Sequence, residues 1–320
     1  MLNAGIVAAM LSMGLMVVGS SGVYGQTYPN KPIRIITSGA GGGGDFTARL
    51  IAQGISASMG QPVIVDNRGS GYIPGEVAYK STPDGYTLLV QGGVAWVYPL
   101  LRKAPYDAVT DFAPISLVER SIFVVSVNPS VAAKSVSELI AVAKARPGAL
   151  NFGSGSVGST NHLAVELFAS MAGINLVHVP SKGAALAITA EIAGETQLTI
   201  FDVGLVMPHV KSGKLRALAV TSAEPSTLAP GLPTVAASGL PGYESTGMTG
   251  MWAPAKTPGA IISRLNQEAV RAINRPDVKE RFLNAGLEIV GSSPEQFAAI
   301  IKSDIARLSK VIKDAGIKLD

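Results

Sequence analysis

Residues Ile33–Asp66, with the sequence IRIITSGAGGGGDFTARLIAQGISASMGQPVIVD, decide the fold of this chain. The β-branched run 33–37 predicts a strand, and a loop rich in glycine follows it. From Asp45 to Met59 the apolar residues recur every three or four positions, which predicts a helix with one buried face. Residues 62–65 then predict a second strand. A strand, a helix and a strand in this order form a βαβ unit, which implies a parallel sheet.

A second unit of the same kind begins at Leu150. A short strand over 150–152 leads into a loop of glycine and serine, a helix with one apolar face follows, and 176–179 predicts the next strand. The 320 residues exceed the usual size of a single hydrophobic core, so we predict two α/β halves. We expect the chain to cross between them near Val127 and near Glu244–Met251. The first domain is then 26–127 plus 248–320, and the second is 128–247.

The composition excludes several classes of protein. Hydrophobic residues make up 47% of the chain and charged residues 15%, which is typical of a globular protein. The net charge is only +4 and aromatic residues reach only 6%, so a nucleic-acid partner is not expected. The chain has no Gly-x-Ser-x-Gly motif of a hydrolase. Its three widely spaced histidines, without any cysteine, match no metal-binding motif.

The first 25 residues have the pattern of a signal peptide. No charged residue precedes Lys31, residues 4–18 form an apolar run shorter than a membrane span, and Val23–Gly25 resembles a cleavage site. We therefore predict export to the periplasm with cleavage near Gly25, so that the mature chain begins near Gln26. The alternative is a buried N-terminal helix, although no capping residue bounds the run.

The two glycine-rich loops are the candidate binding elements. Each precedes a helix, and the first turn of a helix presents N–H groups without helical partners together with the positive end of the helix dipole. These attract an anion without any basic side chain. Because one loop lies in each half, we expect a ligand to be held from both sides. The alternative for either loop is that its glycines only permit a tight turn.

The first loop also matches a dinucleotide-binding fingerprint. Gly39-x-Gly41-x-x-Gly44 lies between a strand and a helix, and Asp66 ends the next strand, where an acid would bind a ribose. An NAD-dependent oxidoreductase is therefore an alternative function. Against it, Asp45 is expected to cap the helix, which would place a negative charge beside the pyrophosphate. No acid/base pair for hydride transfer accompanies the loop, so we expect neither an enzyme nor a cofactor.

Three further side chains could contact a ligand. His162 lies in the first turn of the second helix, where it could bind a ligand or cap the helix. Lys182 follows a strand of the second half and could pair with a carboxylate, although a lone lysine is usually solvated. Asp202 is expected near the hinge, where it could receive the ammonium group of an amino acid.

Short motifs in a fixed order run through most of the chain. They are Gly41-Gly42, Asp45, Ala48-Arg49, Gly60–Val63, Asp66–Arg68, Pro83–Leu89, Tyr106-Asp107, Asp111-Phe112, Asn151–Ser154, Gly158-Ser159, His162–Ala164, His178–Pro180, Lys182-Gly183, Phe201-Asp202 and Gly213–Thr221. Each motif alone is weakly specific. Together, from about Tyr28 to the C-terminus, they resemble the substrate-binding proteins of tripartite tricarboxylate transporters, the Bug family.

This resemblance implies a fold and a function. The fold is α/β, with two Rossmann-like domains joined by a hinge, as in a type II periplasmic binding protein. The function is that of a non-enzymatic solute-binding protein that captures a small carboxylate, such as a di- or tricarboxylate, an acidic amino acid or an aromatic carboxylate. The family holds such ligands mostly through backbone amides and waters, and closes around them. We expect a monomer that serves the membrane subunits of a transporter. A ligand sensor with the same fold is the alternative.

The expected ligand-binding residues come from both loops and from the segments that follow them. They are Gly41, Gly42, Gly43, Asp45, Ser154, Gly158, Ser159, Thr160, His162, Ser181, Lys182, Gly183 and Asp202. The sequence departs from the family pattern at Ala40, where proline is usual. It also departs at Ser181, where tyrosine is usual and which lies beside the expected pocket.

Overall fold

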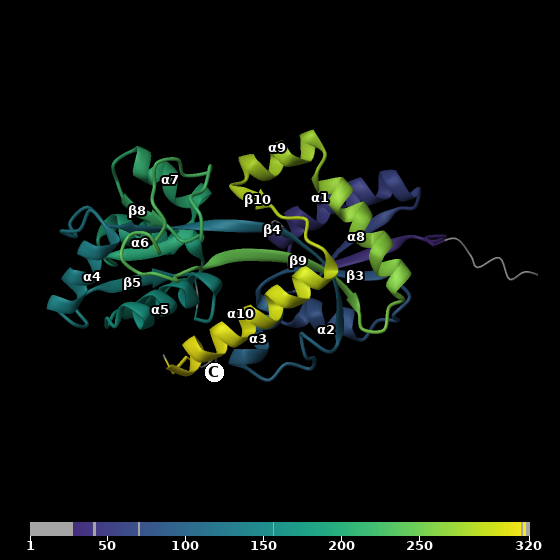
Figure 1. The fold of residues 1–320 in the computed structure, drawn as a ribbon, viewed down its shortest axis with the longest axis horizontal. Helices are drawn as coiled ribbons and strands as arrows, with labels where there is room; N and C mark the ends of the chain where they lie inside the picture. Colours follow the sequence, from purple (N-terminus) through teal and green to yellow (C-terminus); the bar gives the residue numbers. More distant parts are fainter. Residues whose placement is uncertain (1–27, 41–42, 70, 156, 315, 318–320) are drawn as a thin grey trace, which may run out of the picture.

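The structure, a computed structural model, describes residues 28–40, 43–69, 71–155, 157–314, 316 and 317. The predicted signal peptide lies outside the described residues, as do two of the predicted site residues, Gly41 and Gly42. The described chain forms two lobes that lie side by side along the long axis of the molecule (Figure 1).

The predicted βαβ unit of the first half is present. β1 (Ile33–Thr37) pairs in parallel with β2 (Val63–Asn67), and α1 (Gly43–Met59) connects them with its apolar face buried. α1 begins two residues before Asp45, so the expectation that Asp45 caps this helix is wrong. Its carboxylate lies in the first helical turn and pairs with Arg49 one turn further along, with an Nε–Oδ1 distance of 2.9 Å.

Lobe 1 is a sheet with helices on both faces. α1 and α8 pack in one hydrophobic cluster of this lobe, and α3 and α10 pack in another. Besides the βαβ unit, the lobe contains α2 (Ile73–Tyr79), β3 (Thr87–Gly92), α3 (Val94–Leu101), the first part of β4 (Phe112–Val127), β9 (Thr246–Pro254), α8 (Gly259–Ile273), α9 (Pro276–Asn284), β10 (Leu287–Ile289) and α10 (Pro294–Asp314).

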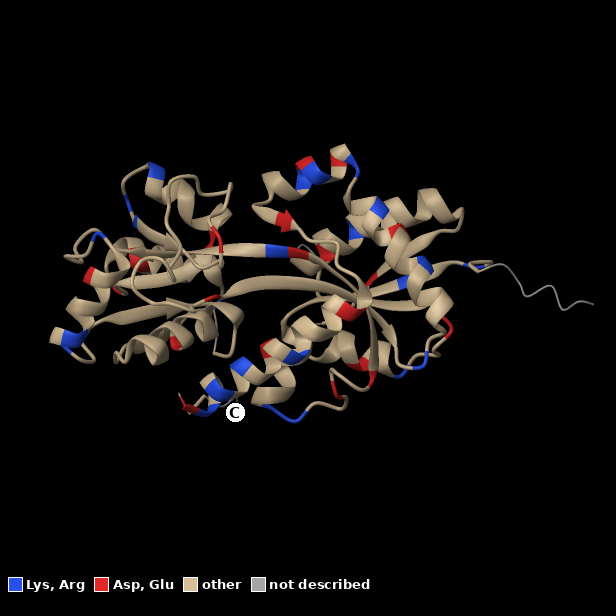
Figure 2. Ribbon diagram, in the orientation of Figure 1, with Lys and Arg blue, Asp and Glu red and all other residues tan. Residues whose placement is uncertain are grey.

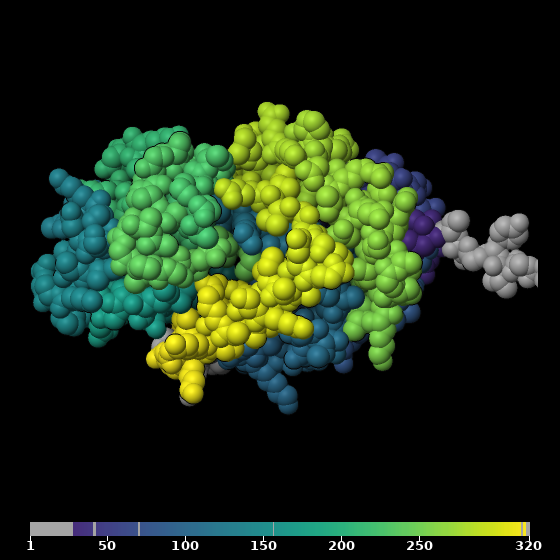
Figure 3. Space-filling view, viewed as in Figure 1, coloured from purple at the N-terminus to yellow at the C-terminus, as the bar shows by residue number. Residues whose placement is uncertain are grey.

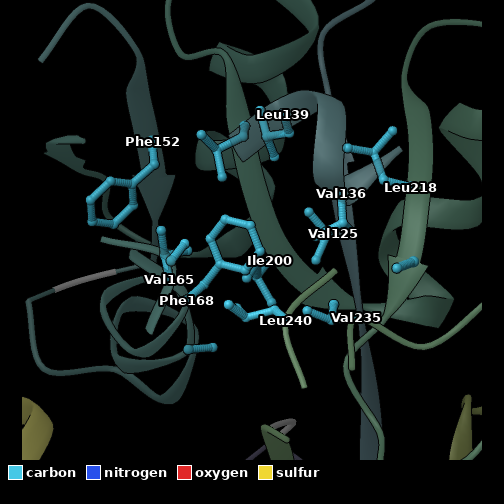
Figure 4. Packing of buried hydrophobic residues seen from close by; sticks show 14 of the residues in the cluster. Val125, Val136, Leu139, Phe152, Val165, Phe168, Ile200, Leu218, Val235 and Leu240 are labelled. Atoms are coloured by element: carbon cyan, nitrogen blue, oxygen red, sulfur yellow. The ribbon is translucent and has the colours of Figure 1, made fainter. Parts of the chain in front are cut away.

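Lobe 2 contains the second predicted βαβ unit. β5 pairs in parallel with β6, and α5 connects them. A core of valine, leucine, isoleucine and phenylalanine side chains fills the space between its sheet and the helices α4 and α5 (Figure 4). The elements of this lobe are the last part of β4, α4 (Val136–Ala145), β5 (Asn151–Ser154), α5 (Thr160–Ala172), β6 (Val177–Pro180), α6 (Ala184–Ala193), β7 (Leu198–Asp202), α7 (Val203–Lys211) and β8 (Arg216–Val220).

The long strand β4 joins the two lobes. From Phe112 to Ile122 it pairs antiparallel with β9, and from Phe123 to Val127 it pairs with β7. The strand order is therefore β2-β1-β3-β9-β4-β7-β5-β6, with β8 and β10 also paired to β4. β9 returns the chain from lobe 2 to lobe 1 (Figure 1). The division into domains at 127/128 and 247/248 stays a prediction.

The C-terminal helix α10 lies across both lobes (Figure 1 and Figure 3). Leu308 of α10 packs in one hydrophobic cluster with Trp96 of α3 and Leu163 of α5. Arg307 donates a hydrogen bond to the carbonyl of Glu244, just before β9. α10 therefore contacts each lobe and the segment that connects them.

A buried carboxyl group connects α6 to the sheet of lobe 2. Glu191 is fully buried, and it accepts hydrogen bonds from Ser126 Oγ at 2.9 Å and from Thr199 Oγ1 at 2.8 Å. Burial raises the pKa of Glu191 from 4.5 to about 7, and the two hydroxyls offset part of this shift. The folded protein therefore keeps a proton on Glu191 over a pH range in which the unfolded chain has lost it.

We predict that Glu191→Gln removes a pH dependence of stability. Because the folded pKa is raised, the contribution of Glu191 is fully present below pH 4.5 and is lost as the pH rises to about 7. The loss is on the order of 3 kcal/mol. Urea unfolding at pH 4.5 and pH 8 should show a smaller loss of stability in the variant than in the wild type. The exposed Glu195→Gln serves as the control and should follow the wild type. An equal pH dependence in Glu191→Gln and the wild type would contradict this prediction.

Candidate functional site

A cavity of about 540 Å³ lies between the two lobes. Lobe 1 contributes the start of α1, the end of β3 with the start of α3, and the start of β9. Lobe 2 contributes the loop before α5. The residues that line it include Gly43 and Gly44, Gln91–Val94, Val157–Thr160 and Gly247–Thr249.

Three helices begin at this cavity. The first residue of each lines it: Gly43 for α1, Val94 for α3 and Thr160 for α5. Their N-termini bring the positive ends of three helix dipoles to one place. No lysine, arginine, aspartate or glutamate is among the lining residues in the described part of the chain. Figure 2 shows the charged residues mostly on the outer helices and loops. The arrangement therefore favours an anion that is bound by backbone groups.

The loop before α5 is held in place by its own helix. Ser159 is the N-cap, and its Oγ accepts a hydrogen bond from the backbone N–H of His162 at 3.3 Å. The N–H of Gly158 donates to His162 Nδ1 at 3.0 Å. Gly158 has a φ of +74°, which a residue with a side chain rarely adopts. These contacts fix the backbone of the part of the loop that lines the cavity.

His162 lies behind this loop and does not line the cavity. It is buried, and its ring stacks on His178 with the ring centres 3.9 Å apart. Glu166 lies on the far side, with 3.4 Å between His162 Nε2 and the carboxylate. Ser154 Oγ lies 2.6 Å from His178 Nε2. Burial, and then the neighbouring His162, lower the pKa of His178 to about 4. Ser159 is the N-cap of α5, and His162 also supports the start of this helix, because its Nδ1 accepts a hydrogen bond from the N–H of Gly158. This agrees with one of its two expected roles, and a direct contact of His162 with a ligand stays a prediction.

The start of α1 is close-packed on one side and open on the other. A side chain at Gly44 would meet the hydroxyls of Thr37 and Ser38 at 3.1 Å, whereas one at Gly43 would meet no atom of the described residues within 4 Å. Asp45 does not line the cavity. Besides the ion pair described above, its carboxylate accepts a hydrogen bond from Asn67 Nδ2 at 2.8 Å.

The remaining predicted residues also lie outside the cavity lining. The backbone N–H groups of Ser181 and Gly183 donate to the carbonyls at positions 154 and 155, which connects this segment to β5. Lys182 is exposed. Asp202 is partly buried, which raises its pKa, and the nearby hydroxyl of Ser121 partly offsets the shift. Ser121 itself lines the cavity. A direct contact of Ser181, Lys182, Gly183 or Asp202 with a ligand stays a prediction.

Sequence reasoning missed the whole contribution of β3 and α3. Gln91, Gly92 and Gly93 line the cavity. The glycine pair before the apolar run of α3 could have indicated this contribution. Here too a strand is followed by glycines and then by a helix, as at the two predicted loops. Glu119 was missed as well. It lies opposite Thr249 in the pairing of β4 with β9, and burial raises its pKa to about 7.

Three further observations on the described residues concern the dinucleotide-binding alternative, a metal site and a membrane span. Asp66, the expected ribose-binding acid, forms ion pairs with Arg34 at 3.5 Å and with Arg68 at 2.8 Å. No group of three histidine, cysteine, aspartate or glutamate side chains there could hold a metal ion. Within the same residues, no helix is both long and apolar enough to cross a membrane.

Comparison with known proteins identifies the family. A sequence model of the tripartite tricarboxylate transporter family receptor, TctC, matches residues 47–317. The chain is 35% identical over 303 residues to protein BugT of Bordetella pertussis, which covers 93% of each chain. It is also similar to the structure of Rpa4515 from R. palustris with adipate, with a TM-score of 0.76 and 33% identity over 91% of this chain and 99% of that chain. MatC from Rhodopseudomonas palustris with bound malate gives a TM-score of 0.73 and 25% identity over 89% of this chain and 100% of that chain.

These findings confirm the predicted resemblance and the predicted type II periplasmic binding protein fold. They also decide between the two functions that the first glycine-rich loop left open, because the matching proteins are receptors and not oxidoreductases. The chain therefore belongs to the tripartite tricarboxylate transporter receptor family, whose members are periplasmic binding proteins, and it is a binding protein rather than an enzyme.

Proposed function

We propose that this receptor captures a small carboxylate in the cavity between its lobes and delivers it to the membrane subunits of a tripartite tricarboxylate-type transporter. The observation that carries the proposal is the cavity itself, where three helices from the two lobes begin and no charged side chain of the described lining offsets their dipoles. A cation would be repelled by this field, and a neutral solute would gain little from it.

The volume of the cavity and the positive potential of the helix N-termini favour a small anion with more than one polar group. Its volume falls within the range of ordinary small-molecule sites. An anionic group near one helix N-terminus gains roughly 0.3–2 kcal/mol, so a ligand that reaches both α1 and α5 gains from each. Two similar structures contain adipate and malate, both dicarboxylates. The proposed class is a di- or tricarboxylate, an acidic amino acid or an aromatic carboxylate.

The direct contacts are proposed for residues that line the cavity. From the predicted set these are Gly43, Gly158, Ser159 and Thr160. The hydroxyl groups of Ser38, Ser121 and Thr249 add donors or acceptors. His162 supports the site indirectly through Gly158.

Closure follows from the position of the cavity. A ligand between α1 and α5 touches both lobes, so it forms more contacts when the lobes are close together than when they are apart. This difference in affinity drives the equilibrium toward the closed arrangement. β4 and β9 connect the lobes and are the proposed hinge, with the domains divided as predicted. The receptor is proposed to act as a monomer.

We predict that Gly43→Val weakens carboxylate binding at least tenfold without unfolding the protein. The added side chain has open space, so the fold should remain, but it would occupy the space where an anion approaches the start of α1. The ligand is first chosen by a thermal-shift screen of the wild type with adipate, malate, succinate, citrate, glutamate and benzoate, and with NAD(H) and NADP(H). Isothermal titration calorimetry of both proteins with the best carboxylate then gives the affinities.

Gly259→Val is the matched control for this experiment. Gly259 is also the first residue of its helix, α8, and a side chain there also meets no atom of the described part of the chain within 4 Å. It does not line the cavity, so this variant should bind like the wild type. Equal affinities of Gly43→Val and the wild type would show that the glycines of this loop only permit a turn. Saturable micromolar binding of a nicotinamide cofactor, with no carboxylate bound, would overturn the proposed function.

Ser159→Ala should lower both stability and affinity. Loss of the N-cap costs about 1 kcal/mol of stability, and loss of one hydrogen bond to the ligand costs roughly 0.5–1.5 kcal/mol of binding. Ser135→Ala is the matched control, because Ser135 caps α4 in the same way, through the N–H of Glu138 at 3.2 Å, away from the cavity. Urea unfolding should show similar losses of stability in both variants, while calorimetry should show weaker binding only in Ser159→Ala. If both variants bind as tightly as the wild type, or if both bind more weakly, a contact of Ser159 with the ligand would be contradicted.

Export to the periplasm is proposed from the charge-free, apolar leader that ends near Gly25. Protein recovered from the periplasm should begin at Gln26 or within a few residues of it. N-terminal sequencing or intact mass measurement tests this. An intact Met1 on the periplasmic protein would contradict cleavage at this site.

A further inference from the structure

One side chain of the cavity has a polarity that does not suit an anion. Gln91, at the end of β3, lines the cavity and is 1% exposed. Its Nε2 donates a hydrogen bond to the carbonyl of Gly71 at 2.7 Å. A carbonyl can only accept, so this contact fixes the orientation of the amide and assigns its other end to the oxygen Oε1.

The oxygen of this amide has no partner among the residues that the structure describes. Gln91 Oε1 is buried, and no described donor lies within hydrogen-bond distance of it. A buried acceptor without a partner costs free energy, and most buried polar groups in proteins have one. The other polar side chains of the lining, such as Ser38, Ser121 and Thr249, carry hydroxyl groups that can donate or accept. Gln91 Oε1 can only accept, so it selects for one polarity.

The cavity also has an apolar wall. Val94, Val97 and Leu101 of α3 line it, and Val157 and Met248 lie on other parts of the lining. A ligand with several charged groups would place some of them against these side chains and lose hydration there. A ligand with one apolar portion would instead bury that portion.

We propose that Gln91 selects ligands that carry a hydrogen-bond donor as well as a carboxylate, so that the natural ligand is a hydroxy or amino carboxylic acid with an apolar body. The carboxylate lies at the helix N-termini, the hydroxyl or ammonium group donates to Gln91 Oε1, and the apolar portion packs on α3. This inference rests on the proposed function, because it assigns a chemical class to the ligand of the same cavity.

The strongest competing explanation is that Gln91 only holds Gly71 in place. In that case a substitution would weaken all ligands by the same factor. A role in selection changes the ratio of affinities between a ligand that has the donor and the matched ligand that lacks it. The ratio therefore separates the two explanations.

The experiment measures the affinity of the wild type for matched series by isothermal titration calorimetry. The series are phenylacetate, mandelate and phenylglycine; 4-methylpentanoate, 2-hydroxy-4-methylpentanoate and leucine; butanoate, 3-hydroxybutanoate and 3-aminobutanoate; and succinate, malate and aspartate. In the series that binds most tightly, we expect the affinity for the hydroxy or amino acid to exceed that for the plain acid by at least about tenfold. The reason is that the plain acid leaves Oε1 unpaired. That series should be one with a single carboxylate.

Two variants then test the assignment to Gln91. Gln91→Met keeps the length of the side chain and removes the acceptor, so the preference should fall to threefold or less. Gln91→Glu keeps an acceptor, so the preference should persist and should shift toward the amino acid. Gln53→Met, on the exposed side of α1, is the matched control and should keep the wild-type ratio.

The outcomes separate this inference from the proposed function. If no carboxylate of any series binds, the proposed function fails and this inference fails with it. If carboxylates bind, but the wild type binds the plain acids as tightly as their hydroxy and amino analogues, only this inference fails. No variant is needed to show that outcome. A preference that is unchanged in Gln91→Met would assign the selection to another residue. Tightest binding of malate or aspartate would contradict the apolar body.

Discussion

The pairing of β4 with strands of both lobes is the constraint on which the rest of the structure depends. β4 pairs with β9 along its first part and with β7 along its last part, so the sheets of the two lobes share this strand. β1 and β3 are both paired in parallel, so their carboxyl ends lie at the same edge of the sheet of lobe 1. β5 ends at the corresponding place in lobe 2. The helices that follow these three strands therefore begin around one cavity, which is the usual position of a ligand in an open α/β sheet.

The electrostatics of the cavity depend as much on what lies behind it as on its lining. Three helix N-termini supply a positive field through the backbone, and no charged side chain of the described lining competes with it. Glu119 is not among the lining residues, but it lies opposite Thr249 on the neighbouring strand, where an ionised carboxylate would oppose an anion. Burial raises the pKa of Glu119 to about 7, so this group carries less negative charge at neutral pH than an exposed glutamate does. Burial raises the pKa of Asp202 in the same direction. Asp45 pairs with Arg49, outside the lining.

Much of the fold could be predicted from the sequence, because both βαβ units carry a clear change from a strand pattern to a helical pattern. The first part of β4 was missed because Pro114, Glu119 and Arg120 interrupt the pattern of a strand, although here they lie in a strand with partners on both sides. α3 was missed because it is short and apolar on all sides, so it has no helical periodicity. The glycine-rich loops identified two of the three helix N-termini. The sequence could not show that His162 supports Gly158, or that Gln91 lines the cavity, because these depend on side-chain contacts and on the shape of the cavity.

The most direct test of this account is a crystal structure of the protein with its tightest-binding carboxylate. The account predicts that the carboxylate lies between the lobes, with its oxygens within about 3 Å of backbone N–H groups at the starts of α1 and α5. A carboxylate without any contact to these backbone N–H groups, or a ligand that lies outside the cavity between α1, α3 and α5, would contradict it.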